Sequence, residues 1–222
     1  MRIKISAPAI LAITIGVMFF ASPNAPAQMF DGFVDDILRP QLGTLWVRSG
    51  QAVTEGNLRS CQISYSALAQ DFEYKEGAFI SLEGSFGFFN SSDGEMVLAL
   101  KLILEDIDRE TGSPTPFAPA NIFFGDGFET MRDAQLGVEP GDIPGSTNTS
   151  YSAQETFEFI LNAVRDEEIT IAFEREASRP AIQFVLDLSV VETDGVGSRT
   201  YSPAAGLEFL ECAEALVGDA VD

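Results

Sequence analysis

The feature that most constrains the fold is a series of short apolar runs separated by turn-forming residues. Residues 61–67 illustrate the pattern, because every second side chain is apolar and those between are polar. That alternation is typical of a strand with one buried face. Turn residues such as those at 55–57 and 90–94 separate the runs. Similar runs recur at residues 45–47, 78–82, 85–89, 169–173 and 182–191. The pattern predicts about eight or nine strands.

Three segments instead have helical spacing, at residues 29–38, 153–164 and 203–216. Ser152 and Glu155 have the spacing of a capping box at the start of the second segment, and Pro203 suits the first position of the last. Residues 96–104 are almost continuously apolar. Such a run is typical of a central strand covered on both faces, although periodicity alone does not exclude a buried helix.

Strands outnumber helices, and no strand–helix alternation is sustained along the chain. We therefore expect a mainly β fold, an antiparallel β-sandwich with two or three appended helices, with an α+β arrangement as the fallback. Residues 28–222 fit a single β-rich domain.

Residues 1–27 are predicted to be a secretory signal peptide. Arg2 and Lys4 precede an apolar stretch, and small residues at 25–27 offer a cleavage site. A retained membrane anchor is the alternative, but the apolar stretch is shorter than a span needs. We expect no transmembrane span after cleavage, and a periplasmic or secreted protein.

Cys61 and Cys212 are the two cysteines of the chain. In an oxidising compartment an even pair is more often bridged than free, so a structural disulfide is predicted. A redox pair is the alternative, but reactive pairs usually lie close together as C-x-x-C.

The charge and composition exclude several classes of function. The chain carries 34 acidic and 13 basic residues, for a net charge of −21, and it contains no histidine. A strongly acidic protein lacks the basic clusters that bind nucleic acid. Without histidine, Ser-His-Asp catalysis and imidazole-ligated metal sites are impossible. We expect no cofactor and no catalytic or metal-binding residue, and we lean against an enzyme.

Carboxylates are the remaining candidates for chemistry, since paired acids support glycoside hydrolysis. The candidate sets are Glu73 with Glu76, Asp106 with Asp108, residues 166–168, and Glu174 with Glu176. Runs of charge are more often solvated faces than sites. Residues 106–112 resemble the start of an EF-hand calcium loop, but the glycine comes one place late and Phe117 occupies the twelfth position.

Residues 137–150 form the longest stretch without periodicity and contain three glycines and two prolines. A long stretch of this kind inside a compact domain is usually mobile or a binding loop. We therefore expect a loop here, and a candidate recognition surface.

The order of these features resembles a known family. Leu45-Trp46-Val47, Cys61-Gln62-Ile63 and the hydrophobic pattern over 159–165, 169–173 and 184–190 are similar to the invasion-associated locus B proteins of bacterial periplasms. The resemblance covers about two thirds of residues 28–222. It implies a small exported β-sandwich linked to host-cell entry or envelope function, without an enzymatic site. This chain lacks the cysteine that the family usually places just after residue 48, and its final helix is also different.

These observations predict an exported, non-enzymatic bacterial protein that binds a partner in the cell envelope or in a host. The alternative is a carboxylate-based glycan hydrolase, or a carbohydrate- or calcium-dependent binding module. Two inward-facing acids in a cleft beside Trp46 or a tyrosine would favour the alternative.

Overall fold

The structure is a computed structural model that describes residues 32–90, 95–125, 131 and 133–219. The predicted signal peptide lies outside these residues. The helices are α1 (Phe33–Leu38), α3 (Ala153–Arg165) and α4 (Ala204–Asp219), with a 3-10 turn at Arg39–Gln41. The strands are β1 (Gly43–Thr54), β2 (Asn57–Asp71), β3 (Ala78–Asn90), β4 (Met96–Ile107), β5 (Pro114–Pro116), β6 (Asn121–Phe124), β7 (Gln135–Pro140), β8 (Ser146–Ser152), β9 (Glu168–Glu174), β10 (Ile182–Asp187), β11 (Val190–Thr193) and β12 (Arg199–Tyr201).

The main layer is an antiparallel sheet with the order β1-β2-β3-β4-β8-β7, and β5 pairs with one end of β4. Long antiparallel hairpins form this sheet. In the first hairpin, the predicted turn after β1 contains Glu55 and Gly56, which both have positive φ. That conformation suits a two-residue hairpin loop. Residues 96–104 form a strand rather than a helix, and this strand lies inside the sheet between β3 and β8.

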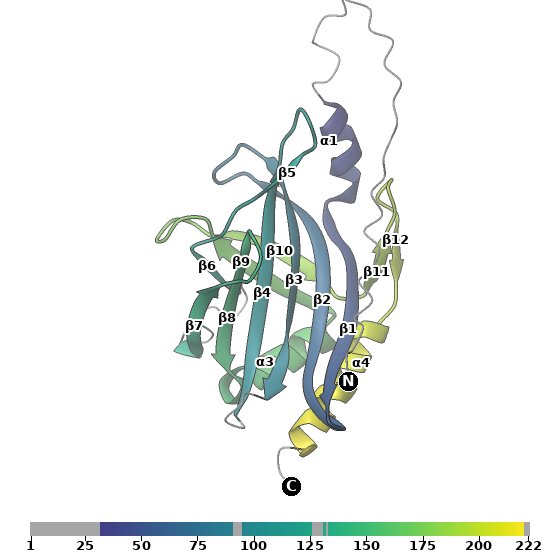
Figure 1. Ribbon diagram of the computed structural model, residues 1–222. Coiled ribbons are helices and arrows are strands. Elements are labelled where there is room, and N and C mark those ends of the chain that lie inside the picture. The colour runs from purple at the N-terminus through teal and green to yellow at the C-terminus, as the bar shows by residue number, and fades with distance from the viewer. Residues whose placement is uncertain (1–31, 91–94, 126–130, 132, 220–222) are drawn as a thin grey trace, which may run out of the picture.

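The second layer covers one face of this sheet and encloses the core (Figure 1). It contains the antiparallel sheet β10-β9-β6 together with α3 and α4. Aromatic rings pack between the layers. The ring centre of Phe86 on β3 lies 5.9 Å from that of Phe124 on β6 and 6.1 Å from that of Phe209 on α4. The fold is therefore mainly β with appended helices, as predicted.

The strands in the described residues are longer than expected, and they number twelve. Gly84 explains one difference, because residues 78–82 and 85–89 continue through it as the single strand β3. A Cβ at Gly84 would lie 2.5 Å from the Tyr65 hydroxyl and 2.4 Å from the Lys101 carbonyl oxygen. This glycine therefore marks a close approach within a strand, not its end.

The helices follow the prediction with two differences of detail. α1 spans Phe33–Leu38, whereas the earlier part of the predicted helix, at residues 29–31, lies outside the described residues. α3 begins after Ser152 as expected, but the Ser152 side chain makes no capping hydrogen bond. Thr156 Oγ1 donates to the Ser152 carbonyl instead. Within the described residues, no helix has the length and apolarity to cross a membrane.

The predicted loop at residues 137–150 is wrong. Most of this stretch belongs to the hairpin of β7 and β8, which pair from Gln135 with Tyr151 to Pro140 with Thr147. A tight turn joins the strands, where the Gly141 N–H donates to the Ser146 carbonyl and Gly145 has positive φ. The polar, Thr- and Ser-rich strand β8 lacks the apolar period by which strands are recognised.

Candidate functional site

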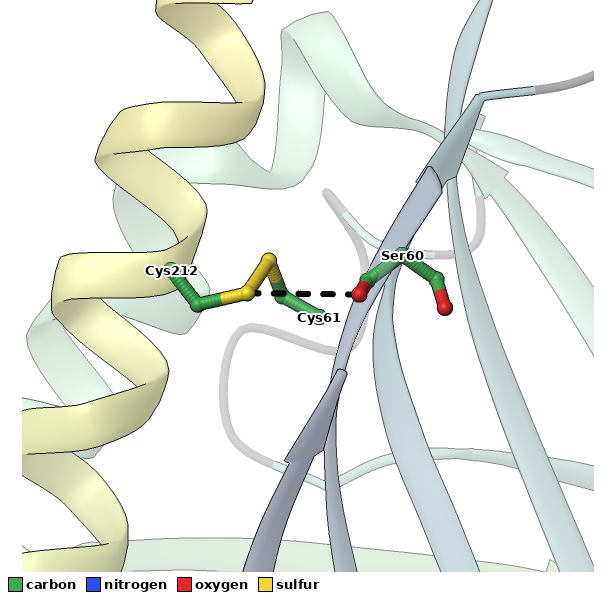
Figure 2. Close-up of a disulfide and its surroundings, with 3 residues drawn as sticks. All are labelled: Ser60, Cys61 and Cys212. Atoms are coloured by element: carbon green, nitrogen blue, oxygen red, sulfur yellow. Dashed lines mark hydrogen bonds between the residues drawn. A yellow bond between two sulfur atoms is a disulfide. The ribbon is translucent and has the colours of Figure 1, made fainter. Parts of the chain in front are cut away.

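The disulfide between Cys61 and Cys212 is present and joins the chain across 151 residues. Cys61 is fully buried on β2 and Cys212 lies on α4, with their Cα atoms 5.8 Å apart (Figure 2). The Cys212 sulfur also lies 3.9 Å from the Ser60 carbonyl oxygen, a van der Waals contact because a bridged sulfur carries no hydrogen. The bridge fixes the final helix against the inner face of the sheet, and such bridges are typical of oxidising compartments.

A groove of about 480 Å³ lies between α4 and the edge of β1. One wall is formed by residues of the sheet and the other by residues of the helix. The lining residues are Ser49, Gly50, Gln51 and Leu58 on the sheet and Glu208, Glu211, Cys212 and Ala215 on the helix. Ser49 donates a hydrogen bond to Glu208, so the strand and the helix are joined by a polar contact as well as by the disulfide.

The edge of β1 is covered at one end and open at the other. Near Thr44 it contacts both β11 and the end of β10: Thr193 Oγ1 of β11 donates to the Thr44 carbonyl at 2.9 Å, and the Asp187 N–H of β10 donates to Thr44 Oγ1 at 2.8 Å. Beyond these contacts, β1 pairs with β2 alone among the described strands. Residues 49–54 therefore present an unpaired strand edge beside the groove, and Val53 is 56% exposed there.

A second groove, of about 690 Å³, lies at the opposite side of the molecule, where β6, β7 and the loop after β9 meet. It is lined by Ala120, Asn121, Gln135, Val138, Glu174, Ala177, Ser178, Arg179 and Pro180. The Gln135 side chain donates to Thr149 Oγ1 at 2.7 Å and to Asn121 Oδ1 at 3.4 Å, which connects the two sheets at the base of this groove.

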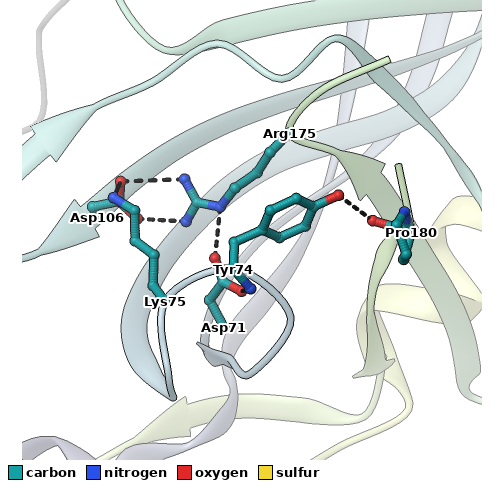
Figure 3. Close-up of polar contacts among 6 residues, drawn as sticks. All are labelled: Asp71, Tyr74, Lys75, Asp106, Arg175 and Pro180. Atoms are coloured by element: carbon teal, nitrogen blue, oxygen red, sulfur yellow. Dashed lines mark hydrogen bonds and ion pairs between the residues drawn. The ribbon is translucent and has the colours of Figure 1, made fainter. Parts of the chain in front are cut away.

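A largely buried ion-pair cluster supports the loop that forms one wall of the second groove (Figure 3). Arg175 Nε donates to Asp71 at 2.6 Å, and its two terminal nitrogens donate to Asp106 at 3.2 and 2.5 Å. Phe117 lies against the guanidinium, 3.8 Å from the ring centre. Farther along the loop, the Tyr74 hydroxyl donates to the Pro180 carbonyl at 2.5 Å. The loop is therefore held at both ends.

The charges in this cluster are matched to each other. Burial opposes the ionised form of Asp106, but hydrogen bonds and opposite charge from Arg175 and Lys75 outweigh it and hold the pKa of Asp106 below its ordinary value. Asp71 is fully buried and also accepts a hydrogen bond from the Tyr74 N–H at 2.7 Å. Both carboxylates are thus used in holding the fold.

The predicted calcium-like loop is stabilised by its own hydrogen bonds. Asp108 Oδ1 accepts from the Thr111 N–H, the Thr111 hydroxyl and the Glu110 N–H, at 2.7 to 3.0 Å. These donors hold the pKa of Asp108 below its ordinary value. Within the described part of the chain, no three acids or cysteines lie close enough together to hold a metal ion.

The other predicted carboxylate sets lie apart from one another. Glu73, Glu76 and Glu176 are exposed on loops, whereas Glu174 borders the second groove. Asp166 and Glu168 line a shallow hollow of about 300 Å³ beside Phe159. Trp46 pairs with Ser66 on the face of the sheet opposite the core, where Arg48 lies 5.1 Å from its ring. Neither of the two grooves is lined by Trp46.

The sequence reasoning did not single out Glu208, Glu211 or Arg175. The two glutamates are three positions apart on the last helix, a spacing that places them on one side of it, but only the fold shows that this side faces a strand edge. Arg175 is the cation of the buried cluster, and no local signal connects it to Asp71 and Asp106.

Comparisons of this chain with family models, with curated proteins and with solved structures found no match. The resemblance to the invasion-associated locus B proteins stays a prediction.

Proposed function

We propose that this protein is exported by a bacterium, acts in the periplasm or after secretion, and binds a protein partner of the cell envelope or host without catalysis. The observation that supports this function best is the groove between β1 and α4, because it combines an unpaired strand edge with a helical wall. The N-terminal sequence, with Arg2 and Lys4 before an apolar stretch, supports export.

A groove of this construction suits protein recognition. An exposed strand edge offers main-chain donors and acceptors to an extended segment of a partner, and the adjacent wall contributes specificity. The disulfide holds α4 in position before any partner arrives, which reduces the entropy lost on binding. Both features belong to the folded chain and need no cofactor.

The test is site-specific photocrosslinking in the native host. A photoreactive residue at Gln51, in the groove, is compared with one at Gln62, which is exposed on the neighbouring strand β2. Gln62 pairs with Gly50, on the face of the sheet opposite Gln51. We expect one protein to be captured repeatedly through Gln51 and not through Gln62. Equal capture at both positions, or none at Gln51, would contradict the proposal.

The hollow beside Phe159 favours the alternative function, because it brings Asp166 and Glu168 next to an aromatic ring. Sugars commonly bind where an aromatic face and polar side chains meet. A glycan array and a hydrolysis assay on the same glycans, each with Asp166→Asn and Glu168→Gln, test this function. Binding or cleavage that both variants abolish would favour the alternative.

A further inference from the structure

We propose that the groove between β1 and α4 binds an extended, basic segment, which adds a strand to the free edge of β1 at residues 49–54. This inference rests on the proposed function and gives the chemistry of the partner. The argument has three parts: the edge, the charge of the wall, and the pattern of side chains.

The edge is open to pairing. Residues 49–54 read Ser-Gly-Gln-Ala-Val-Thr, with no charge and no proline. Natural proteins usually protect exposed edges with charged residues, prolines or bulges, because unpaired main-chain groups attract other strands. A bulge lies between Ala52 and Val53, but the edge carries no charged or proline residue. Six residues span roughly 20 Å, enough for a partner strand of similar length.

The wall opposite the edge is acidic. Glu208 and Glu211 line the groove, and no Lys or Arg is among its lining residues. The whole chain has a net charge of −21, so a second copy of it or an acidic partner would be repelled. A segment containing Lys or Arg is the occupant that this charge attracts.

The geometry also predicts the pattern of the segment. Successive side chains of an added strand point to opposite faces of the sheet. Because α4 lies on the inner face, every second side chain of the segment faces Glu208 and Glu211. We therefore expect Lys or Arg at alternate positions, with β-branched residues such as Val or Thr between them.

The experiment measures binding of two labelled octapeptides by fluorescence anisotropy, one alternating Lys with Val and the other alternating Glu with Val. The protein is used as its host processes it, with the disulfide intact. Three variants are compared with it: Glu211→Gln and Glu208→Gln in the groove, and Glu214→Gln as the matched control. Glu214 is exposed on α4 but does not line the groove. Hydrogen exchange is then measured at residues 49–54.

We expect the Lys peptide to bind and the Glu peptide not to bind. Glu211→Gln should weaken binding about two- to fivefold, Glu208→Gln at least as much, and Glu214→Gln not at all. Exchange at residues 49–54 should slow in the complex, because an added strand engages those amides. Higher salt should also weaken binding of the Lys peptide to the unmodified protein, because it screens the attraction between opposite charges.

Several results would overturn the inference. These are equal binding of both peptides, no binding of the Lys peptide, equal loss from Glu214→Gln and Glu211→Gln, or binding without slower exchange at residues 49–54. Crosslinking separates the two proposals. A partner that crosslinks to Gln51 through a neutral or acidic segment would leave the proposed function intact. It would contradict the inference that the groove binds a basic segment. Failure of both experiments contradicts both.

Discussion

The two edges of the large sheet are built differently. β7, at one edge, has six residues, an irregular register between Gln135 and Gly137, a charged residue at Glu139 and a proline at its end. β1, at the other edge, has twelve residues, and its open part at 49–54 has a bulge between Ala52 and Val53 but carries neither charge nor proline. Short length, charge, proline and bulges are the features that prevent strand edges from pairing. The β7 edge therefore combines all four features, whereas the β1 edge has only the bulge and lies open beside a groove.

The interactions that hold the groove walls beside the two edges differ as well. Beside β7, the groove wall depends on the ion pairs of Arg175 with Asp71 and Asp106. Beside β1, the wall depends on the disulfide between Cys61 and Cys212. Buried ion pairs respond to pH and to loss of either partner, whereas a disulfide responds to reductant. The two sides can therefore be disturbed one at a time.

The largest effect is expected from Arg175→Ala. This change leaves the carboxylate of Asp71 buried without its cation, and removing one partner of a buried ion pair costs about 3–5 kcal/mol. Arg179→Ala is the matched control, because Arg179 lies on the same loop and only stacks over Tyr74, at 5.6 Å. Its cost should stay below about 1 kcal/mol. Urea unfolding of both variants measures the difference, and equal costs would show that the cluster does not support the fold.

Removing the disulfide should have the next largest effect. Cys61→Ala with Cys212→Ala is expected to lower the free energy of unfolding by about 2–4 kcal/mol, since the closed loop is long. Reduction of the unmodified protein should lower the free energy of unfolding by a similar amount, which is measured as a lower melting temperature. The Lys peptide should also bind more weakly, because α4 is no longer fixed beside β1. An unchanged melting temperature after full reduction would show that α4 is held without the bridge.

The sequence predicted the elements and the covalent bond better than the surfaces. Apolar alternation identified most strands, and the even cysteine pair identified the disulfide, because both signals depend on local pattern or on simple redox chemistry. Residues 78–82 and 85–89 were predicted as separate strands but form one, because Gly84 continues the strand where it lies close to Tyr65 of the neighbouring strand. Residues 137–150 were misinterpreted as a loop, because β8 lies in the sheet with polar side chains such as Asn148 and Ser150.

The grooves could not be predicted from the sequence for a related reason. Glu208 and Ser49 are 159 positions apart and meet only because the last helix folds back onto the first strand. Arg175 and Asp71 are 104 positions apart. A charged residue gives no local sign of its distant partner, so a chain with 34 acidic residues offers many equivalent pairs. Topology, not composition, selects among them.

Acid should weaken the side of the molecule near β7. The pKa of Asp106 is lower in the folded protein than in the unfolded chain. Such a carboxylate stabilises the fold above its unfolded pKa of about 3.9 and loses that contribution as the pH falls through its lower folded value. Asp106→Asn should therefore flatten the loss of stability below about pH 4. A hydrogen bond from Lys101 also holds the pKa of Asp142 below its ordinary value, but this carboxylate is exposed and screened by solvent, so Asp142→Asn should change the profile much less than Asp106→Asn. Urea midpoints from pH 7 downward test this, and overlapping profiles for Asp106→Asn and the unmodified protein would contradict it.

The smallest change in stability should come from making the edge of β7 resemble that of β1. Glu139→Thr with Pro140→Thr removes the charge and the proline from an exposed part of the strand, so the free energy of unfolding should change by less than about 0.5 kcal/mol. The association state should change more, because β7 would then offer an unprotected edge with Val138 partly exposed. Sedimentation velocity over a range of concentrations should detect association of this variant, strongest at high salt, where the repulsion between copies of net charge −21 is screened. A variant that sediments as the unmodified protein does at every concentration would mean that the short length of β7, together with its irregular register near Gln135, protects this edge. Charge and proline would then not be what distinguishes β7 from β1.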